Sequence, residues 1–291
     1  MRRLNWLGVW AVVLASMGLL ALVRLAQTAP PELPEPTVSQ SAPADAPGEL
    51  VFCVIGDMQQ GGEPKRLQIV SRLAAAMAEE RPQVVLACGD YIDGSSDPAT
   101  SRRQLAQVLQ ALSPLQRHGE VPLAAALGNH DRALPSSVLR ATFGPPYYSF
   151  NLGQCHFVVL DTQQPGQYGR IEGEQWAWLI DDLQQAQAAR FIFVVMHQPL
   201  FPVSVHRGSS LDKYPRFRDR LHELFVRMRV ACVFHGHEHL YNRQERDGVT
   251  YVITGGGGAP LYADELRGGF YHYLRVDVTG AEYRVTVKRL N

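Results

Sequence analysis

Five short clusters of polar residues carry carboxylate, amide and imidazole groups, the side chains that bind transition metals in proteins. In chain order they are Asp57 with Gln59, Asp90 with Asp93, Asn129 with His130 and Asp131, His197 alone, and His237 with His239. Oxygen and imidazole donors in one set suit manganese, iron or zinc better than calcium. Two such ions about 3.5–4 Å apart can clamp a phosphoryl group and generate a hydroxide nucleophile at neutral pH. These residue types therefore predict a centre of two transition-metal ions, divalent or of mixed valence.

Each cluster follows a run of apolar residues that predicts a buried strand. Residues 84–88 are such a run, which Gly89 ends and Asp90 follows. A continuous apolar run of this length is typical of a parallel strand that is buried on both faces. The other runs are 50–55, 121–127, 191–196 and 230–234. Ligands of open α/β sheets bind beyond the carboxyl ends of the strands, so we expect the five clusters to meet there.

Helical spacing of apolar residues fills the stretches between these strands. The spacing predicts helices over 66–80, 98–115, 172–188 and 211–228. Antiparallel pairs are expected over 147–152 with 155–160 and over 271–278 with 283–290, and a short strand over 251–254. Alternating strands and helices followed by antiparallel strands predict a mixed α/β fold, a four-layer α/β/β/α sandwich of two mixed sheets with helices outside.

The amino-terminal segment has the features of a membrane anchor. Arg2 and Arg3 precede an uncharged, largely apolar run over 6–23, long enough to span a bilayer as a helix. A secretory signal peptide has the same order of charge and apolar region, but the small-residue cleavage sites after this run are poor. We therefore expect residues 1–27 to be an uncleaved signal anchor, with cleavage and a secreted or periplasmic product as the alternative.

Charge and composition extend this prediction to the parts that follow the anchor. Basic first residues stay in the cytoplasm, so the rest of the chain would face the extracytoplasmic side of the cytoplasmic membrane as a single-pass protein. Residues 28–48 contain six prolines among alanine, serine and glutamate, a composition that stays extended and would tether the domain over 49–291.

The overall charge excludes one class of partner. The 291 residues include 28 Lys and Arg against 28 Asp and Glu, which leaves no basic field for a nucleic acid. A small phosphate ester held by metal ions remains compatible with that balance. The four cysteines are Cys53, Cys88, Cys155 and Cys232, all in apolar runs, and they predict buried thiols. A Cys53–Cys88 disulfide is possible if the domain is exported.

Taken in order, the clusters resemble the calcineurin-like metallophosphoesterase superfamily, from about residue 51 to the end of the chain. The family pattern is D-x-H, G-D-x-x-D, G-N-H-D/E, a lone His and G-H-x-H. The resemblance implies a first metal on Asp57, Gln59, Asp90 and His239, and a second on Asp90, Asn129, His197 and His237. Asp90 would bridge the two ions.

The resemblance also implies the reaction. It implies hydrolysis of phosphate mono- or diesters, with metal-bound hydroxide as the nucleophile. His130 would protonate the leaving group, and Asp131 would hold the imidazole by a hydrogen bond. Residues 236–243, the glycines after Thr254 and residues 147–150 are similar to the purple acid phosphatase-like branch.

The chain departs from the family at two positions. Gln59 stands where the family usually has His, and a neutral amide oxygen binds borderline metals more weakly than imidazole. Asp93 stands where purple acid phosphatases have a Tyr ligand, and it would either orient a ligand or cap a helix. His235 is expected in the core or behind the ligands, whereas His118 and His206 carry no motif and are assigned ordinary surface or loop roles.

These departures leave a second functional hypothesis open. The chain could be a non-catalytic or weakly active metal-binding envelope protein that keeps the phosphoesterase fold, because fold alone does not fix function. Hydrolysis of nitrophenyl esters with added metal separates the two hypotheses.

Overall fold

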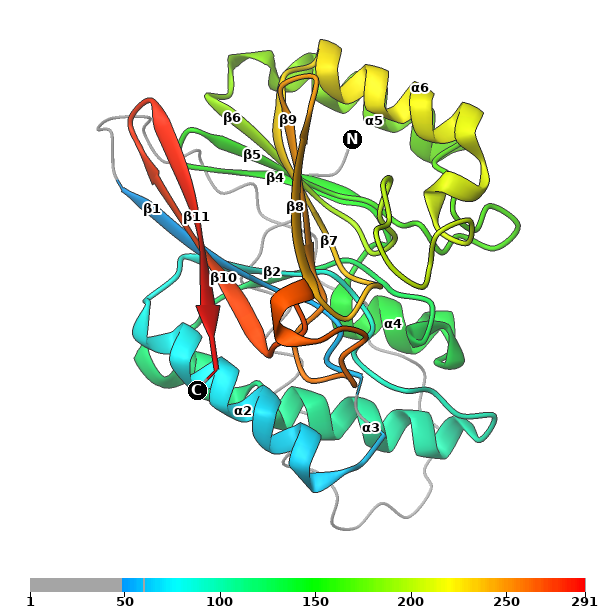
Figure 1. The fold of residues 1–291 in the computed structure, drawn as a ribbon, viewed down its shortest axis with the longest axis vertical. Helices are drawn as coiled ribbons and strands as arrows, with labels where there is room; N and C mark the ends of the chain where they lie inside the picture. Colours follow the sequence, from blue (N-terminus) through cyan, green and yellow to red (C-terminus); the bar gives the residue numbers. More distant parts are fainter. Residues whose placement is uncertain (1–48, 60, 291) are drawn as a thin grey trace, which may run out of the picture.

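The computed structural model describes residues 49–59 and 61–290, which form two β-sheets with helices on their outer faces (Figure 1). The predicted signal anchor over 1–27 lies outside the described residues, and so does the proline-rich tether over 28–48. Within the two described ranges, no helix combines the length and the apolar character needed to cross a bilayer.

The first sheet has five strands in the order β11-β10-β1-β2-β3. These are β1 (Leu50–Ile55), β2 (Val84–Ala87), β3 (Leu123–Ala125), β10 (His272–Thr279) and β11 (Glu282–Arg289). β1, β2 and β3 run parallel, with Phe52 opposite Val84 and Val85 opposite Leu123, whereas β10 runs antiparallel to β1. Because β2 and β3 are buried along their whole length, their sequences are continuous apolar runs rather than alternating ones.

The second sheet has six strands in the order β4-β5-β6-β7-β9-β8. These are β4 (Tyr148–Leu152), β5 (Cys155–Val159), β6 (Phe191–Val195), β7 (Val230–His235), β8 (Tyr241–Arg246) and β9 (Val249–Thr254). β5, β6, β7 and β9 run parallel, and the edge strands β4 and β8 run antiparallel to their neighbours. Both sheets are therefore mixed, as the sequence predicts.

Helices cover the outer face of each sheet (Figure 1). They are α2 (Pro64–Glu79), α3 (Pro98–Ala111) and α4 (Ser136–Phe143) on the first sheet, and α5 (Gly173–Gln185) and α6 (Pro215–Arg227) on the second. Apolar side chains fill the space between α2 and the first sheet, around Leu73, and between α5, α6 and the second sheet, around Leu179 and Phe225. A third core joins the sheets, where the rings of Phe52 and Phe193 meet edge to face at 5.0 Å. The mixed α/β class is thus as predicted.

Two elements do not follow from the sequence pattern. β8 is an edge strand whose last residues, Arg243 to Arg246, are mostly exposed, so it lacks the apolar run that marks the other strands. α4 has eight residues, only about two turns, too few to establish a helical period. The helix expected from residue 211 begins at Pro215, because Leu211–Lys213 form a separate 3-10 turn.

The cysteines are buried and free, so the possible Cys53–Cys88 disulfide is not formed. Cys53 packs in the outer core of the first sheet, whereas Cys88 packs in the core between the sheets. Side chains on opposite faces of a sheet point apart and cannot be bridged.

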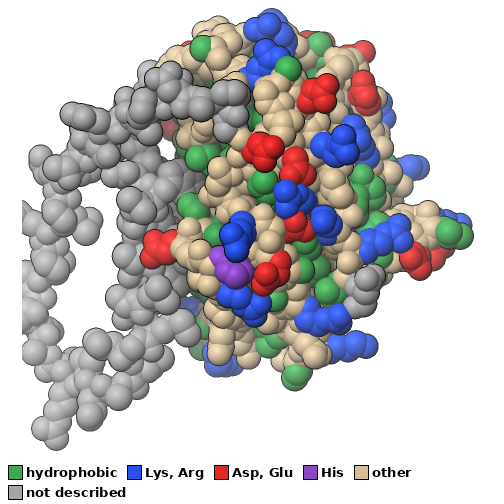
Figure 2. Space-filling view, turned by 90° about the vertical axis from the view of Figure 1, so that its left-hand side faces the viewer, with side chains coloured by type: hydrophobic (Ala, Val, Ile, Leu, Met, Phe, Trp, Pro, Cys, Tyr) green, Lys and Arg blue, Asp and Glu red, His purple; other side chains and the backbone are tan. Residues whose placement is uncertain are grey.

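Charged side chains of both signs share the surface. On the face drawn in Figure 2, Lys and Arg side chains lie between Asp and Glu side chains rather than in one block. This face therefore offers no uniformly basic surface.

Candidate metal centre

The seven predicted metal ligands converge beyond the carboxyl ends of β1, β2, β3, β6 and β7. They are Asp57, Gln59, Asp90, Asn129, His197, His237 and His239. All but Asn129 are buried, and consecutive contacts of 3.6 Å or less connect the whole set. Parallel strands from both sheets thus deliver their end residues to one place, which is where α/β folds bind ligands.

The tightest part of the set is centred on His197. Its Nε2 atom lies 3.0 Å from Asn129 Oδ1, 3.1 Å from His237 Nδ1 and 3.3 Å from Asp90 Oδ2. Asp90, His197 and His237 each offer one donor atom, and these three atoms lie within 4.8 Å of one another. Nitrogen and oxygen donors at this spacing match the mixed coordination that zinc, iron or manganese takes.

Carbonyl groups behind two of the histidines fix their tautomers. His197 Nδ1 donates to the Cys88 carbonyl at 2.8 Å, and His239 Nδ1 donates to the Pro260 carbonyl at 2.7 Å. In the neutral form of each ring, Nε2 therefore carries the lone pair and is the atom that can bind a cation. Metal-bound histidines are oriented by this kind of outer hydrogen bond, so the donor set fits a cation.

The electrostatics of the centre also favour positive charge. Asp57 and Asp90 are almost completely buried, at 0% and 1% exposure. Burial opposes a charge on His197, yet Asp90 and Asp57 outweigh it and raise the pKa of His197 to about 9. Burial likewise raises the pKa of Asp57 well above its ordinary value, and the nearby Asp90 adds to the effect. Two buried carboxylates in contact with imidazoles are stabilised when a cation lies between them.

The backbone is strained where it delivers these groups. Asp57, Asp90 and His237 all have positive φ, at 58°, 55° and 71°, a conformation that costs non-glycine residues about 1–3 kcal/mol each. Neighbouring glycines admit the carboxylates, because a Cβ on Gly128 would lie 2.0 Å from Asp90 Oδ1 and one on Gly236 would lie 2.4 Å from Asp57 Oδ2. The glycines of the G-N-H and G-H-x-H motifs are therefore required by close packing.

Gln59 reaches the centre, but through its amide nitrogen. Its Nε2 donates to Asp90 Oδ2 at 3.1 Å, and its backbone carbonyl accepts from Arg66 Nη1 at 3.3 Å. Coordination through the amide oxygen would require the amide to turn by about 180°. Gln59 is thus placed beside the Asp90 carboxylate as a hydrogen-bond donor.

Asp93 supports the centre from outside. Its carboxylate forms an ion pair with Arg66 at 3.0 Å, and its carbonyl accepts a hydrogen bond from His130 Nδ1 at 2.7 Å. The cap of α3 is Asp97. Asp93 therefore does not cap the helix, and it holds Arg66 and the ring of His130, neither of which is a predicted metal ligand.

The prediction that Asp131 forms a hydrogen bond to the His130 ring is wrong. Asp131 is fully buried and accepts the backbone N–H groups of Asp90, Tyr91 and Gly128 at 2.8–2.9 Å. Burial, together with the charge of Asp90, raises the pKa of Asp131 to about 7. Three backbone donors at the strand ends engage this carboxylate, and the ring of His130 is held by the Asp93 carbonyl instead.

Three residues that no motif marks also belong to the centre. Glu238 is fully buried, and its carboxylate accepts the N–H groups of Val203 and Ser204, both at 2.6 Å. The ring of His206 lies 3.9 Å from that of His237, and the ring of Tyr262 stacks at 4.0 Å on His239. The only sequence signal for Glu238 is its place between His237 and His239, and His206 is not the ordinary loop residue that we expect.

Two further histidines, His235 and His118, lie where the sequence predicts. His235 is buried at the end of β7, with its ring 6.2 Å from Tyr251. His118 lies at the surface, 3.4 Å from Glu79.

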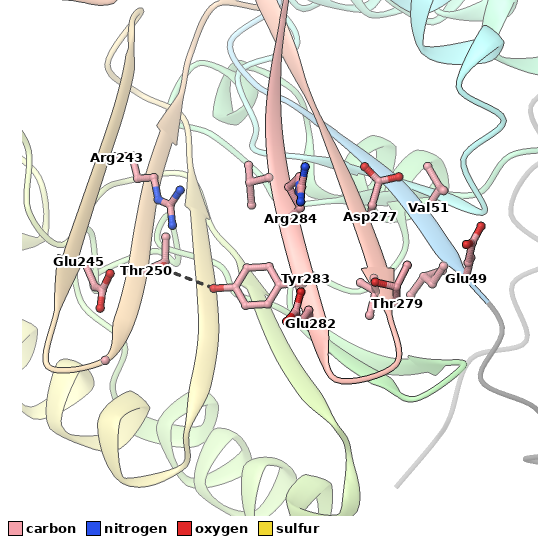
Figure 3. Close-up of a pocket in the computed structure, with 14 residues that line it drawn as sticks. Glu49, Val51, Arg243, Glu245, Thr250, Asp277, Thr279, Glu282, Tyr283 and Arg284 are labelled. Atoms are coloured by element: carbon pink, nitrogen blue, oxygen red, sulfur yellow. Dashed lines mark hydrogen bonds between the residues drawn. The ribbon is translucent and has the colours of Figure 1, made fainter.

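Figure 3 shows a surface cavity of about 770 Å³, and none of the predicted metal ligands lines it. Arg243, Arg284 and Asp277 line it, and Tyr283 donates a hydrogen bond to Thr250 across it. The first residues of β1 line this cavity, whereas Asp57 and Gln59 follow the last residue of β1. The length of β1, about 20 Å, therefore separates the cavity from the metal ligands.

Comparison with known proteins agrees with this geometry. The family model described as calcineurin-like phosphoesterase matches residues 50–241. Serine/threonine-protein phosphatase CPPED1 of Danio rerio is 27% identical over 226 residues, which are 72% of each chain. Purple acid phosphatase PPD1 from yellow lupin has the same fold, with a TM-score of 0.67 at 17% identity over 85% of this chain and 52% of that one.

A second solved structure is also similar in fold to this chain. A dimetal phosphatase from Danio rerio superposes with a TM-score of 0.67 at 15% identity, over 82% of this chain and 96% of that one. The chain belongs to the calcineurin-like phosphoesterase family, near its purple acid phosphatase-like branch, and is a metallophosphoesterase.

Proposed function

We propose that this metallophosphoesterase hydrolyses phosphate mono- or diesters with a centre of two transition-metal ions. The observation that carries the proposal is the buried cluster of donor atoms from Asp90, His197 and His237, all within 4.8 Å of one another. The contact between His239 Nε2 and Asp57 Oδ1, at 3.6 Å, supports a second position beside it. The zebrafish protein of the same fold is described as a dimetal phosphatase.

The two ions would share Asp90. The first would be held by Asp57, Gln59, Asp90 and His239, and the second by Asp90, Asn129, His197 and His237. When bound, manganese, iron or zinc supplies Lewis acidity, which lowers the pKa of water and offsets the charge of phosphoryl oxygens. The buried carboxylates and the two oriented imidazoles support this assignment.

His130 is the proposed general acid. Its backbone N–H donates to Asp90 Oδ1 at 2.9 Å, which fixes the residue beside the bridging carboxylate. Because Nδ1 is held by the Asp93 carbonyl, Nε2 remains to carry the mobile proton. In the proposed step, a hydroxide derived from water forms a bond to phosphorus while the bond between phosphorus and the ester oxygen breaks, and that ester oxygen takes the proton from His130 Nε2.

Turnover with defined metals tests the proposal. The full-length chain would be stripped with a chelator, refilled with Mn, Zn or Fe, and assayed on nitrophenyl mono- and diesters and on phosphoserine and phosphothreonine peptides. The peptides are included because the relative CPPED1 is named a serine/threonine phosphatase. We expect hydrolysis that requires metal and about two ions per chain.

The opposite result would support the second function. Metal binding without hydrolysis of any ester, whichever metal is added, would favour a non-catalytic metal-binding envelope protein. This alternative is supported by Gln59, which presents its amide nitrogen rather than its oxygen to Asp90 and would therefore weaken the first metal position.

We also propose, from the sequence alone, that residues 1–27 anchor the chain in the cytoplasmic membrane with the catalytic domain on the extracytoplasmic side. Protease added to intact cells should digest the domain while a cytoplasmic marker survives. Recovery of the whole chain in the membrane fraction would support the anchor, and a shortened soluble product would support signal cleavage.

A further inference from the structure

A few large apolar side chains are exposed at the surface. Among the described residues they are Tyr168, Val205, Tyr262 and Leu266, with exposures of 37%, 65%, 38% and 100%. Two of them, Val205 and Tyr262, lie on loops that form hydrogen bonds to the segment with His237 and His239. Apolar groups held in water by an ordered backbone often mark contact surfaces.

Val205 is held in place by the segment between the two metal ligands. Glu238 accepts the N–H groups of Val203 and Ser204 at 2.6 Å and that of His206 at 3.4 Å. These bonds fix the backbone on both sides of Val205, whose side chain remains 65% exposed. The neighbouring residue, His206, has its ring centroid 3.9 Å from that of His237. Val205 therefore lies on a loop that contacts the predicted metal ligands.

Tyr262 approaches the same segment from another loop. Its N–H donates to the His239 carbonyl at 3.2 Å, and its ring stacks on the His239 ring at 4.0 Å with an interplanar angle of 18°. The ring of His206 lies 5.6 Å away, which links Tyr262 to the loop of Val205. One part of the Tyr262 ring is thus covered by a predicted metal ligand and another part faces solvent.

We propose that Val205 and Tyr262 contact the organic group of the ester, so that the enzyme prefers phosphate monoesters that carry an aromatic ring. This inference rests on the proposed function, since it assumes that the phosphoryl group lies at the metal ligands. An aromatic ring buries more apolar area than a short alkyl chain and gains edge or offset contacts with Tyr262. Val205 adds a branched apolar surface to the same contact.

Phenethyl phosphate and ethyl phosphate test the preference without changing the leaving-group chemistry, because both release an alcohol of similar acidity. The full-length, metal-loaded protein should show a KM about tenfold lower for the phenethyl ester, with kcat nearly equal, because burying part of a ring favours binding by roughly that factor. Binding of phenethylphosphonate and ethylphosphonate, measured by calorimetry, should show the same ratio without turnover.

Substitutions assign the preference to the two side chains. Val205→Ala should reduce the ratio of the two KM values about threefold by raising KM for the phenethyl ester alone. Tyr262→Ala should reduce it further, and Tyr262→Phe should retain it because the ring remains. Leu266→Ala is the matched control, since it removes a fully exposed apolar side chain from the neighbouring turn and should leave both substrates unaffected.

The outcomes separate this inference from the proposed function. Equal KM values and equal phosphonate affinities in the wild-type protein would overturn the inference and leave the phosphoesterase intact. An unchanged ratio in Val205→Ala and Tyr262→Ala would also overturn it. Absence of hydrolysis with a retained phosphonate preference would instead contradict the proposed function alone.

Discussion

Asp90 is fixed on both of its carboxylate oxygens. Oδ2 accepts from Gln59 Nε2 at 3.1 Å and lies 3.3 Å from His197 Nε2, while Oδ1 accepts from the His130 N–H at 2.9 Å. A carboxylate held at this many points is oriented by the protein itself, which is the preorganisation that metal sites depend on. Substitutions at the neighbours of Asp90 should therefore affect metal affinity more than they affect the fold.

Gln59→His should strengthen the first metal position. An imidazole in place of the amide is a better ligand for borderline metals, and we expect the weaker of the two proposed ions to bind at least about tenfold more tightly. Calorimetric titration of chelator-treated protein with Zn or Mn measures this directly. Gln110→His adds a histidine on an exposed part of α3 and is the control. The same two affinities in both variants would place residue 59 outside the metal position.

His130→Ala should reduce turnover by about 10²–10⁴-fold while metal content stays the same. The loss should be large for an alkyl phosphate, whose alkoxide needs a proton, and much smaller for nitrophenyl phosphate, whose leaving group does not. Metal counting and kcat on the two esters provide the comparison, with His118→Ala at the surface as the control. An equal loss on both esters would argue for a role in positioning, and lost metal would argue for one in ligation.

At the scale of single elements, the strand ends are the part that the sequence predicts best. Continuous apolar runs identify β1, β2, β6 and β7, and the polar residues after them converge as expected. The side-chain contacts around these strand ends do not follow from the sequence. Asp131 bonds to Asp90 and Tyr91, 40 or more positions away, and no local spacing encodes such a partner. The sequence does not predict β8 for a different reason, because a polar edge strand carries no apolar signal.

The loop over 203–206 depends on one buried carboxylate. Glu238→Gln keeps the shape of the side chain but replaces one acceptor oxygen with an NH₂ group, which faces the backbone donors that the carboxylate now accepts. Each hydrogen bond to a charged acceptor contributes about 1.5–3 kcal/mol. We therefore expect hydrogen exchange of the N–H groups of Val203, Ser204 and His206 to accelerate at least about tenfold, with exchange in β5 and β6 unchanged.

Asp264→Asn is the matched control for this loop. Asp264 caps the short 3-10 helix Glu265–Arg267 on a different loop, where its side chain accepts from the Arg267 N–H. Its substitution should leave exchange over 203–206 as in the wild type. Unchanged protection of these amides in Glu238→Gln would show that the loop is held by other contacts.

At the scale of the whole molecule, the centre exists only where the two sheets meet. β1, β2 and β3 of one sheet supply Asp57, Asp90 and Asn129, and β6 and β7 of the other supply His197 and His237. Contacts that join the sheets therefore contribute to both stability and metal binding. The core around Phe52, Phe157 and Phe193 is one such contact, and the pair of His272 and Thr254 is another.

His272 makes the contact between the two sheets sensitive to pH, because it pairs with Thr254 of the other sheet. It lies at the start of β10, fully buried, with Nδ1 donating to the Phe270 carbonyl at 2.9 Å and Nε2 lying 3.0 Å from Thr254 Oγ1 of β9. Burial lowers the pKa of His272 from 6.5 to about 4, and the charge of Arg289 adds to this. The folded state therefore keeps the ring neutral where the unfolded chain would bind a proton.

This shift predicts the direction of an acid effect on stability. A group with a depressed pKa stabilises the fold fully above its unfolded value, and that contribution is lost as pH falls from 6.5 toward 4, by up to about 3 kcal/mol. His272→Gln keeps a polar side chain near Thr254 and removes the titration. Its free energy of unfolding, from urea denaturation of the metal-free protein, should fall less steeply than that of the wild type across this window. His118→Gln, at the surface, should follow the wild-type curve, and a His272→Gln curve parallel to wild type would assign the acid sensitivity to other groups.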